Sequence, residues 1–241
     1  MPLNAELTII LPVFNEAENL PILWPELLTA LAPHWEDVEI IFVDDASTDG
    51  STEWLRDLAR RDARVRHVRF ARQSGLTAAL DAGYRRARAP IVVTMDSDLQ
   101  SNPADIPRLV AALGNADAAT GWRSRRQDPW LKRVSSRIGN GVRNALTHET
   151  IHDSACTLRA MRRECLDALP PYDGLHRFVP TLLKIAGYRV VEVPVDHRPR
   201  RFGESKFGVR NRAGRAFRDL LTVRWMQQRR LRGVAEEETK P

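Results

Sequence analysis

Four short strand-like segments recur through the first hundred residues, and a helical pattern follows each of the first three. They span residues 7–13, 38–43, 65–70 and 91–95. Strands buried on both faces of a sheet have short apolar sequences of this kind. Strands that alternate with helices through short connections favour a mainly parallel sheet with helices on both faces. The sequence therefore predicts an α/β fold.

The pattern is less regular after Pro103. We expect a strand over 156–161, a helix over 177–186 and a charged loop over 197–209. No composition shift marks a linker, so residues 1–211 are expected to form a single domain. Two further segments follow it: a basic amphipathic helix over 212–232 and an acidic, disordered tail over 233–241.

The fourth strand ends in two carboxylates. Asp96, Asp98 and Gln100 alternate in the sequence, so an extended chain places their side chains on one side. Their oxygens suit Mg²⁺ or Mn²⁺ and leave other coordination positions for phosphate oxygens and water. The alternative is an Asp-rich turn, because Asp-x-Asp alone is a weak signal.

Acidic residues also follow the first two strands. Glu16 comes after the first, and Asp44 and Asp45 end the second. Carboxyl ends of parallel strands meet at one edge, where open α/β sheets bind ligands. Acids gathered there repel one another unless a cation or hydrogen-bond donors compensate. A nucleoside diphosphate bound with a metal ion would supply that compensation.

Several segments resemble, in order, the motifs of family 2 glycosyltransferases with the GT-A fold. The closest branch makes polyprenyl-phosphate sugars, as dolichyl-phosphate mannose synthases and undecaprenyl-phosphate glycosyltransferases do. The resemblance spans roughly residues 6 to 225. The segments that carry it are 11–19, 43–51, 95–100, 121–123, 153–159, 176–178, 192–195 and 200–206.

The resemblance implies a donor site. The positions matching nucleoside contacts are Pro12, Phe14, Glu16, Val43 and Asp45, with Phe14 standing where the family often has Tyr. The metal and diphosphate positions are Asp96, Ser97, Asp98 and Gln100. Arg123 matches a basic residue between the donor and acceptor phosphates. Arg200 and Lys206 match a mobile loop that closes over the diphosphate and offsets leaving-group charge.

The resemblance also implies an acceptor side. Lys132, Arg133, Ser136 and Arg137 resemble lipid-phosphate contacts on one predicted helix. His176 and Arg177 are either a second acceptor contact or polar helix residues. A phosphate acceptor is already anionic and needs little deprotonation, so we assign Asp153 to orienting Arg123 or the acceptor.

These residues predict inverting transfer of a sugar from a GDP- or UDP-sugar to a polyprenyl phosphate, with Mg²⁺ or Mn²⁺ as cofactor. A family 2 transferase with a saccharide acceptor is the alternative enzyme. A non-catalytic nucleotide-sugar-binding subunit is the alternative from another class. The acidic residues and both loop cations favour the enzyme.

The basic residues gather near the end of the sequence. Net charge is +6, but nine basic residues and one acid lie between Lys206 and Arg232. This composition suits an interfacial helix on anionic lipid, or alternatively a helix docked on the domain. No apolar run of about 18 residues occurs, so no transmembrane helix is expected. We expect a cytoplasmic protein on the inner membrane face, with a possible integral-membrane partner and no nucleic acid.

Overall fold

The computed structural model describes residues 6–124, 141–147, 149–202 and 210–230. One sheet of seven strands forms its centre, in the order β3-β2-β1-β4-β6-β5-β7. Neighbouring strands are parallel except at β6, which runs antiparallel to β4 and β5. The predicted mainly parallel sheet is confirmed. The strands are β1 Leu7–Val13, β2 Val38–Asp44, β3 Val65–Arg69, β4 Ile91–Thr94, β5 Ala118–Trp122, β6 Arg159–Arg162 and β7 Val190–Pro194.

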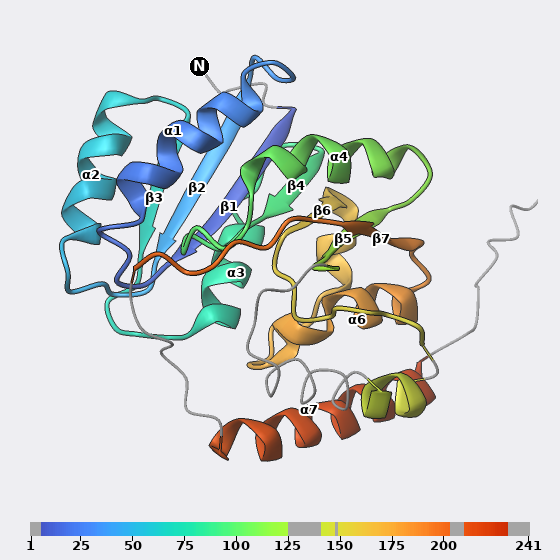
Figure 1. The fold of residues 1–241 in the computed structure, drawn as a ribbon. Helices are drawn as coiled ribbons and strands as arrows, with labels where there is room; N and C mark the ends of the chain where they lie inside the picture. Colours follow the sequence, from blue (N-terminus) through green and yellow to red (C-terminus); the bar gives the residue numbers. More distant parts are fainter. Residues whose placement is uncertain (1–5, 125–140, 148, 203–209, 231–241) are drawn as a thin grey trace, which may run out of the picture.

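Helices cover both faces of the sheet (Figure 1). One face packs against α1 (Leu20–Leu31), α2 (Ser51–Arg61) and α4 (Ile106–Ala111). The other packs against α3 (Leu76–Tyr84) and α6 (Val179–Ala186). A further helix covers 141–147. The last helix, α7 (Arg210–Arg229), overlaps the helix predicted over 212–232.

Strand β1 shows why these sequences form central strands. Ile9 and Leu11 point to one face of the sheet and Ile10 to the other, and all three are fully buried. Pro12 has no amide hydrogen to donate, but it stands next to the last residue of the strand. Its carbonyl oxygen accepts a hydrogen bond of 2.7 Å from Ser97 Oγ, which ties the end of β1 to the end of β4.

Two predicted elements differ from the structure. The strand predicted over 156–161 is β6, which begins only at Arg159 and runs opposite to its neighbours. The helix predicted over 177–186 starts as a 3₁₀ turn, Leu175–Phe178, and becomes α-helical at Val179. Pro180 lies in the first turn of α6, where a missing amide hydrogen costs nothing.

The direction of β6 brings the second half of the chain to the carboxyl edge of the sheet. Its first residue, Arg159, pairs with Thr94 at the end of β4 and with Thr120 near the end of β5. The segment just before β6 therefore lies at the edge where the parallel strands finish. This edge collects residues from both halves of the chain.

Close packing of α3 on β1 gives a test of the fold. A methyl group added at Gly83 would overlap the side chain of Ile10, so Gly83→Ala should destabilise the protein by about 1–3 kcal/mol. Gly114→Ala is the matched control, because nothing lies within 4 Å of the added carbon. Urea unfolding measures both variants, and equal stabilities would contradict the packing.

Candidate functional site

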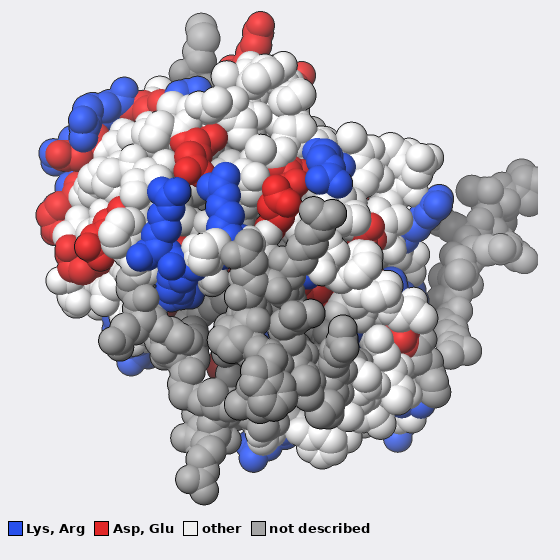
Figure 2. All heavy atoms as spheres, in the orientation of Figure 1, with Lys and Arg blue, Asp and Glu red and all other residues white. Residues whose placement is uncertain are grey.

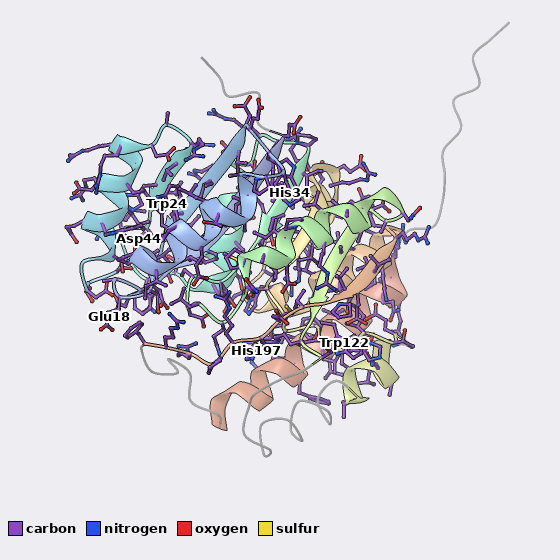
Figure 3. All side chains as sticks on the ribbon, turned by 45° about the horizontal axis from the view of Figure 1, so that its top comes forward. Glu18, Trp24, His34, Asp44, Trp122 and His197 are labelled. Carbon is purple, nitrogen blue, oxygen red and sulfur yellow. The ribbon has the colours of Figure 1, made fainter. Side chains whose placement is uncertain are left out.

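The candidate site lies along the carboxyl edge of the sheet. Asp44 ends β2 and Trp122 ends β5, and Figure 3 labels them toward opposite sides of this edge with His197 between them. The segment after β7 runs from that strand back across the front of the molecule to the side of β1 and β2 (Figure 1). The edge therefore combines the loops after the first, second, fourth, fifth and last strands of the parallel set.

Three residues at this edge have left-handed backbone conformations. Asn15 follows β1, Ala46 follows β2 and Leu99 follows β4, with φ angles of 54°, 61° and 63°. They are the only non-glycine residues with positive φ in the described ranges. Such conformations cost energy and are concentrated at functional sites. Sequence inspection did not find them, because Ala and Leu carry no signal for a left-handed turn.

The loops after β1 and β2 are joined by hydrogen bonds. Asn15 N donates to Ser47 Oγ at 3.0 Å, and Glu16 N donates to Ser51 Oγ at 2.9 Å. The Glu16 carboxylate accepts from Asn19 Nδ2 at 2.5 Å. Phe14 and Glu16 are thus held beside the end of β2, where Val43 and Asp45 lie. The structure brings together the residues that the resemblance assigns to the nucleoside.

The two adjacent aspartates after β2 have different surroundings. Asp44 is fully buried and accepts from Thr52 Oγ1 at 2.5 Å and from Ser47 N at 2.8 Å. Burial would raise the pKa of Asp44, but these bonds and nearby His67 hold the pKa well below the usual carboxyl range. Asp44 is therefore a structural carboxylate inside the loop.

Asp45 instead accepts two backbone amides at the start of α3. The donors are Ser74 N at 2.6 Å and Gly75 N at 2.8 Å. This fixes the loop before α3 against the end of β2 and orients the Asp45 carboxylate. The predicted nucleoside contact at Asp45 involves a side chain that is already ordered.

The carboxylates after β4 also differ from each other. Asp96 accepts a very short hydrogen bond from Thr157 Oγ1, and burial together with the charge of Asp98 raises the pKa of Asp96 to about 6. Asp98 accepts from the backbone amide of Gln100 at 3.1 Å. The carboxylates of Asp96 and Asp98 repel each other, so they favour a bound cation that relieves this repulsion.

Arg200 supplies a cation at this place. Its Nη2 lies 2.7 Å from Asp98 Oδ2 and 3.4 Å from Gln100 Oε1. Arg198, two residues earlier, donates to Glu26 Oε2 at 2.5 Å and to Asn102 Oδ1 at 2.8 Å. The segment that carries Arg200 is therefore anchored to α1 and to the loop after β4. Figure 2 shows basic and acidic side chains side by side on this face.

Arg123 and Asp153 form a bidentate ion pair. Arg123 Nε and Nη2 donate to the two oxygens of Asp153 at 2.7 and 2.9 Å. Burial would lower the pKa of Arg123, but Asp153 outweighs it and raises the pKa. The structure thus places Asp153 where it orients Arg123, one of the two roles that the sequence suggested.

Two residues that sequence reasoning missed hold this part of the site. Glu192 on β7 accepts the amides of His152 and Asp153 at 2.9 and 3.2 Å. Arg159 is 1% exposed and donates to Ser154 O at 2.9 Å. Both are charged residues inside a strand, Glu192 in β7 and Arg159 in β6, and this was the available signal, because charges shielded from water need specific partners.

The oxygens at this edge suit a divalent metal ion. Hard oxygen ligands are offered by Asp96, Asp98 and Gln100. The guanidinium of Arg200 already contacts Asp98 and Gln100. No group of three or more His, Cys, Asp or Glu side chains in the described residues is arranged to hold a metal ion.

The predicted acceptor contacts are less complete. His176 Nδ1 lies 2.7 Å from Thr77 Oγ1 on α3, and Arg177 Nη1 lies 3.5 Å from Asp219 Oδ2 on α7. Both side chains therefore join neighbouring elements of the fold. Lys132, Arg133, Ser136, Arg137 and Lys206 lie outside the described residues.

Comparison with known proteins agrees with this geometry. A family model described as glycosyl transferase family 2 matches residues 8–169, which is more than half of the chain. The chain belongs to this family.

Two curated relatives are similar over most of the chain. Both are undecaprenyl-phosphate 4-deoxy-4-formamido-L-arabinose transferases, one from Aeromonas hydrophila subsp. hydrophila and one from Edwardsiella ictaluri. Each is 36% identical over 204 residues, covering 84% of this chain and 63% of the relative. The chain thus spans less than two thirds of their length.

Solved structures share the fold. A glucosyl-3-phosphoglycerate synthase from Mycobacterium tuberculosis with Mn²⁺ and UDP matches 92% of this chain and 80% of its own, at TM-score 0.65 and 20% identity. A mannosyltransferase from Pyrobaculum calidifontis with GDP-Man and Mn²⁺ matches 95% of this chain and 74% of its own, at TM-score 0.61 and 20% identity. The GT-A fold is confirmed.

The buried carboxylate of Asp44 predicts a pH dependence. Its pKa is depressed in the folded state, so its stabilisation is present above the unfolded pKa of about 4 and is lost as pH falls below it. Asp44→Asn should cost about 3 kcal/mol at pH 7 and roughly 0.7 kcal/mol less at pH 3.5. Urea unfolding at the two pH values measures this difference. Asp57→Asn, on the surface of α2, is the control, and a pH-independent cost for Asp44→Asn would contradict the assignment.

Proposed function

We propose that this protein transfers a sugar, with inversion, from a nucleoside-diphosphate sugar to a polyprenyl phosphate. One observation carries the proposal: the acids after β4, the Arg123–Asp153 pair and Arg200 all meet at one edge of a GT-A sheet. The names of the 36% identical relatives support a polyprenyl-phosphate acceptor. Neighbours with the same fold hold UDP in one case and GDP-Man in another, so both donor bases fit this fold.

The donor nucleoside lies against the loops after β1 and β2 in this proposal. Phe14 gives an apolar wall, and Glu16 and Asp45 provide acceptors for base or ribose hydroxyl groups. Pro12 and Val43 lie next to the ends of their strands, and the side chain of Val43 is buried in the core. The links between the two loops order this surface before the donor arrives. Less entropy is then lost on binding.

The diphosphate lies over the end of β4. Asp96 and Asp98, with Gln100 as a third or outer ligand, would hold Mg²⁺ or Mn²⁺, and Ser97 lies between them. A bound divalent ion supplies positive charge that stabilises the leaving diphosphate. Arg200 and Lys206 add positive charge to the same oxygens as the sugar–phosphate bond breaks.

The acceptor phosphate approaches from the side of Arg123. Its oxygen is already ionised near neutral pH, so attack on the anomeric carbon needs no proton transfer to the protein. Asp153 holds Arg123 through both carboxylate oxygens and acts as a positioning residue. Lys132, Arg133, Ser136 and Arg137 complete the acceptor side, with His176 and Arg177 as a second contact.

Replacing one carboxylate tests the proposal. Asp98→Asn should lower transfer from UDP- or GDP-sugars to undecaprenyl phosphate at least about a thousandfold, because the ion and the diphosphate lose their shared anchor. Product formation is measured with purified lipid and each donor in the presence of Mn²⁺. Asp57→Asn, a surface change of equal charge, should retain wild-type activity. Full activity of Asp98→Asn would overturn the metal assignment.

A lipid acceptor requires contact with a membrane, and we propose that α7 provides it. Leu220 and Val223 are buried against Leu182 of α6 and Phe178, which directly precedes α6. On another face, Phe217, Leu221 and Trp225 recur every four residues and are 52%, 48% and 59% exposed. A helix that is docked on one side and apolar on another suits shallow insertion into a bilayer.

The basic residues of α7 also favour binding to a membrane. Arg218 and Arg229 are exposed beside this apolar stripe, and the sequence carries further arginines along the helix. Basic residues are attracted to the anionic cytoplasmic leaflet. No helix within the described ranges is long and apolar enough to cross a bilayer. We therefore propose peripheral association with the inner membrane face, where an integral-membrane partner could also bind.

Flotation with liposomes tests the α7 surface. The double variant Leu221→Ser/Trp225→Ser should bind phosphatidylglycerol vesicles at least about tenfold more weakly than wild type, because two exposed apolar side chains that would enter the bilayer are lost. Tyr172→Ser removes an aromatic side chain that is 61% exposed outside α7, and it serves as the control. Wild-type protein that does not float at low salt would contradict membrane binding.

A further inference from the structure

The guanidinium of Arg200 contacts oxygen atoms that would coordinate the proposed metal ion. Its Nη2 donates to Asp98 Oδ2 at 2.7 Å and lies 3.4 Å from Gln100 Oε1. The side chain of Asp98 is 12% exposed and that of Arg200 is 30% exposed, so the carboxylate is more shielded from water than the guanidinium. A divalent ion approaching the same carboxylate oxygen meets a positive charge that already occupies it.

The arginine is held there by the segment that carries it. Arg198 N donates to Gln100 O at 2.9 Å, and its guanidinium binds Glu26 and Asn102. His197 forms a β-bridge with Ser101 just before it. The backbone up to Arg198 is therefore fixed to the loop that contains Asp98. Arg200 can exchange partners by rotating its own side chain, without opening of this segment.

We infer that Arg200 is an exchangeable counter-ion of Asp98, which couples metal binding to nucleotide binding. Without nucleotide, the guanidinium neutralises Asp98 and competes with a divalent ion for it. A bound diphosphate offers Arg200 another anionic partner, and Asp98 is then released to the metal ion. Metal and nucleotide consequently bind with positive cooperativity.

The inference rests on the metal site of the proposed function, but it concerns binding order and not sugar transfer. Coupling is reciprocal: if the nucleotide strengthens metal binding, the metal strengthens nucleotide binding by the same factor. Removal of Arg200 should affect the two ligands in opposite directions. Metal binding alone becomes stronger, whereas binding of the diphosphate becomes weaker. A simple diphosphate contact would weaken the nucleotide and leave metal binding unchanged.

Titration of the purified full chain with Mn²⁺, followed by electron paramagnetic resonance, tests this. In the absence of nucleotide, Arg200→Gln should bind Mn²⁺ at least roughly fivefold more tightly than wild type, the lower end of typical coupling. With UDP or GDP added, the affinity of wild type for Mn²⁺ should rise, and the advantage of Arg200→Gln should disappear. No sugar or lipid is present, so failure of sugar transfer would not affect the result.

Three controls make the result specific. Arg201→Gln changes the net charge equally at a neighbouring exposed residue, and it should stay within about twofold of wild type. Arg200→Lys keeps a positive charge and should recover part of the competition. Asp98→Asn should lose Mn²⁺ binding, which identifies the site. Thermal melts verify that each variant is folded.

Other outcomes would overturn this inference or the proposed function. Mn²⁺ affinity that is unchanged or weaker in Arg200→Gln would overturn the exchange, as would an equal gain in Arg201→Gln. Absence of Mn²⁺ binding in every protein, with and without nucleotide, would overturn the metal site and this inference with it. Mn²⁺ binding with the predicted coupling but without sugar transfer would overturn only the proposed acceptor or activity.

Discussion

The reversed direction of β6 is the constraint on which the second half of the site depends. In a purely parallel sheet, the segment before a strand lies at the edge opposite to the ligand-binding edge. Because β6 is antiparallel, the residues before it reach the same edge as the ends of β4 and β5. Asp153 can then bind Arg123, and Thr157 can bind Asp96. These contacts connect the residues proposed for the acceptor with those proposed for the donor.

Two charged side chains, one of them fully buried, hold this junction in place. Arg159, inside the sheet, donates to the carbonyl of Ser154, and Glu192 accepts the amides of His152 and Asp153. A buried charge that loses its partner is costly, so each of these contacts restricts the loop before β6. Arg123 is consequently presented in one orientation. A fixed arginine stabilises developing negative charge better than a mobile one, since less reorganisation is needed during reaction.

The first half of the site depends on left-handed backbone turns. Left-handed residues follow β1, β2 and β4, and each allows the chain to turn sharply at the edge. Asn15 and Glu16 contribute amides to side chains of the next loop, so the turns support one another. Asp44 holds the same loop from inside, whereas Asp45, which is also buried, binds the amides before α3. The adjacent residues Asp44 and Asp45 thus have separate roles.

The sequence by itself determined the parallel half of the sheet, the place of the acidic residues and the family of the chain. Short apolar runs specify strands that are buried on both faces of a sheet, and parallel strands leave their carboxyl ends at one edge whatever the details of packing. Only the tertiary structure decided the direction of β6, the separate roles of Asp44 and Asp45, and the partner of Arg200. Those features depend on contacts between residues far apart in the chain, such as Arg200 with Asp98, and no local pattern encodes them. The exposed stripe of α7 was decided in the same way, because only docking against α6 shows which apolar residues remain outside.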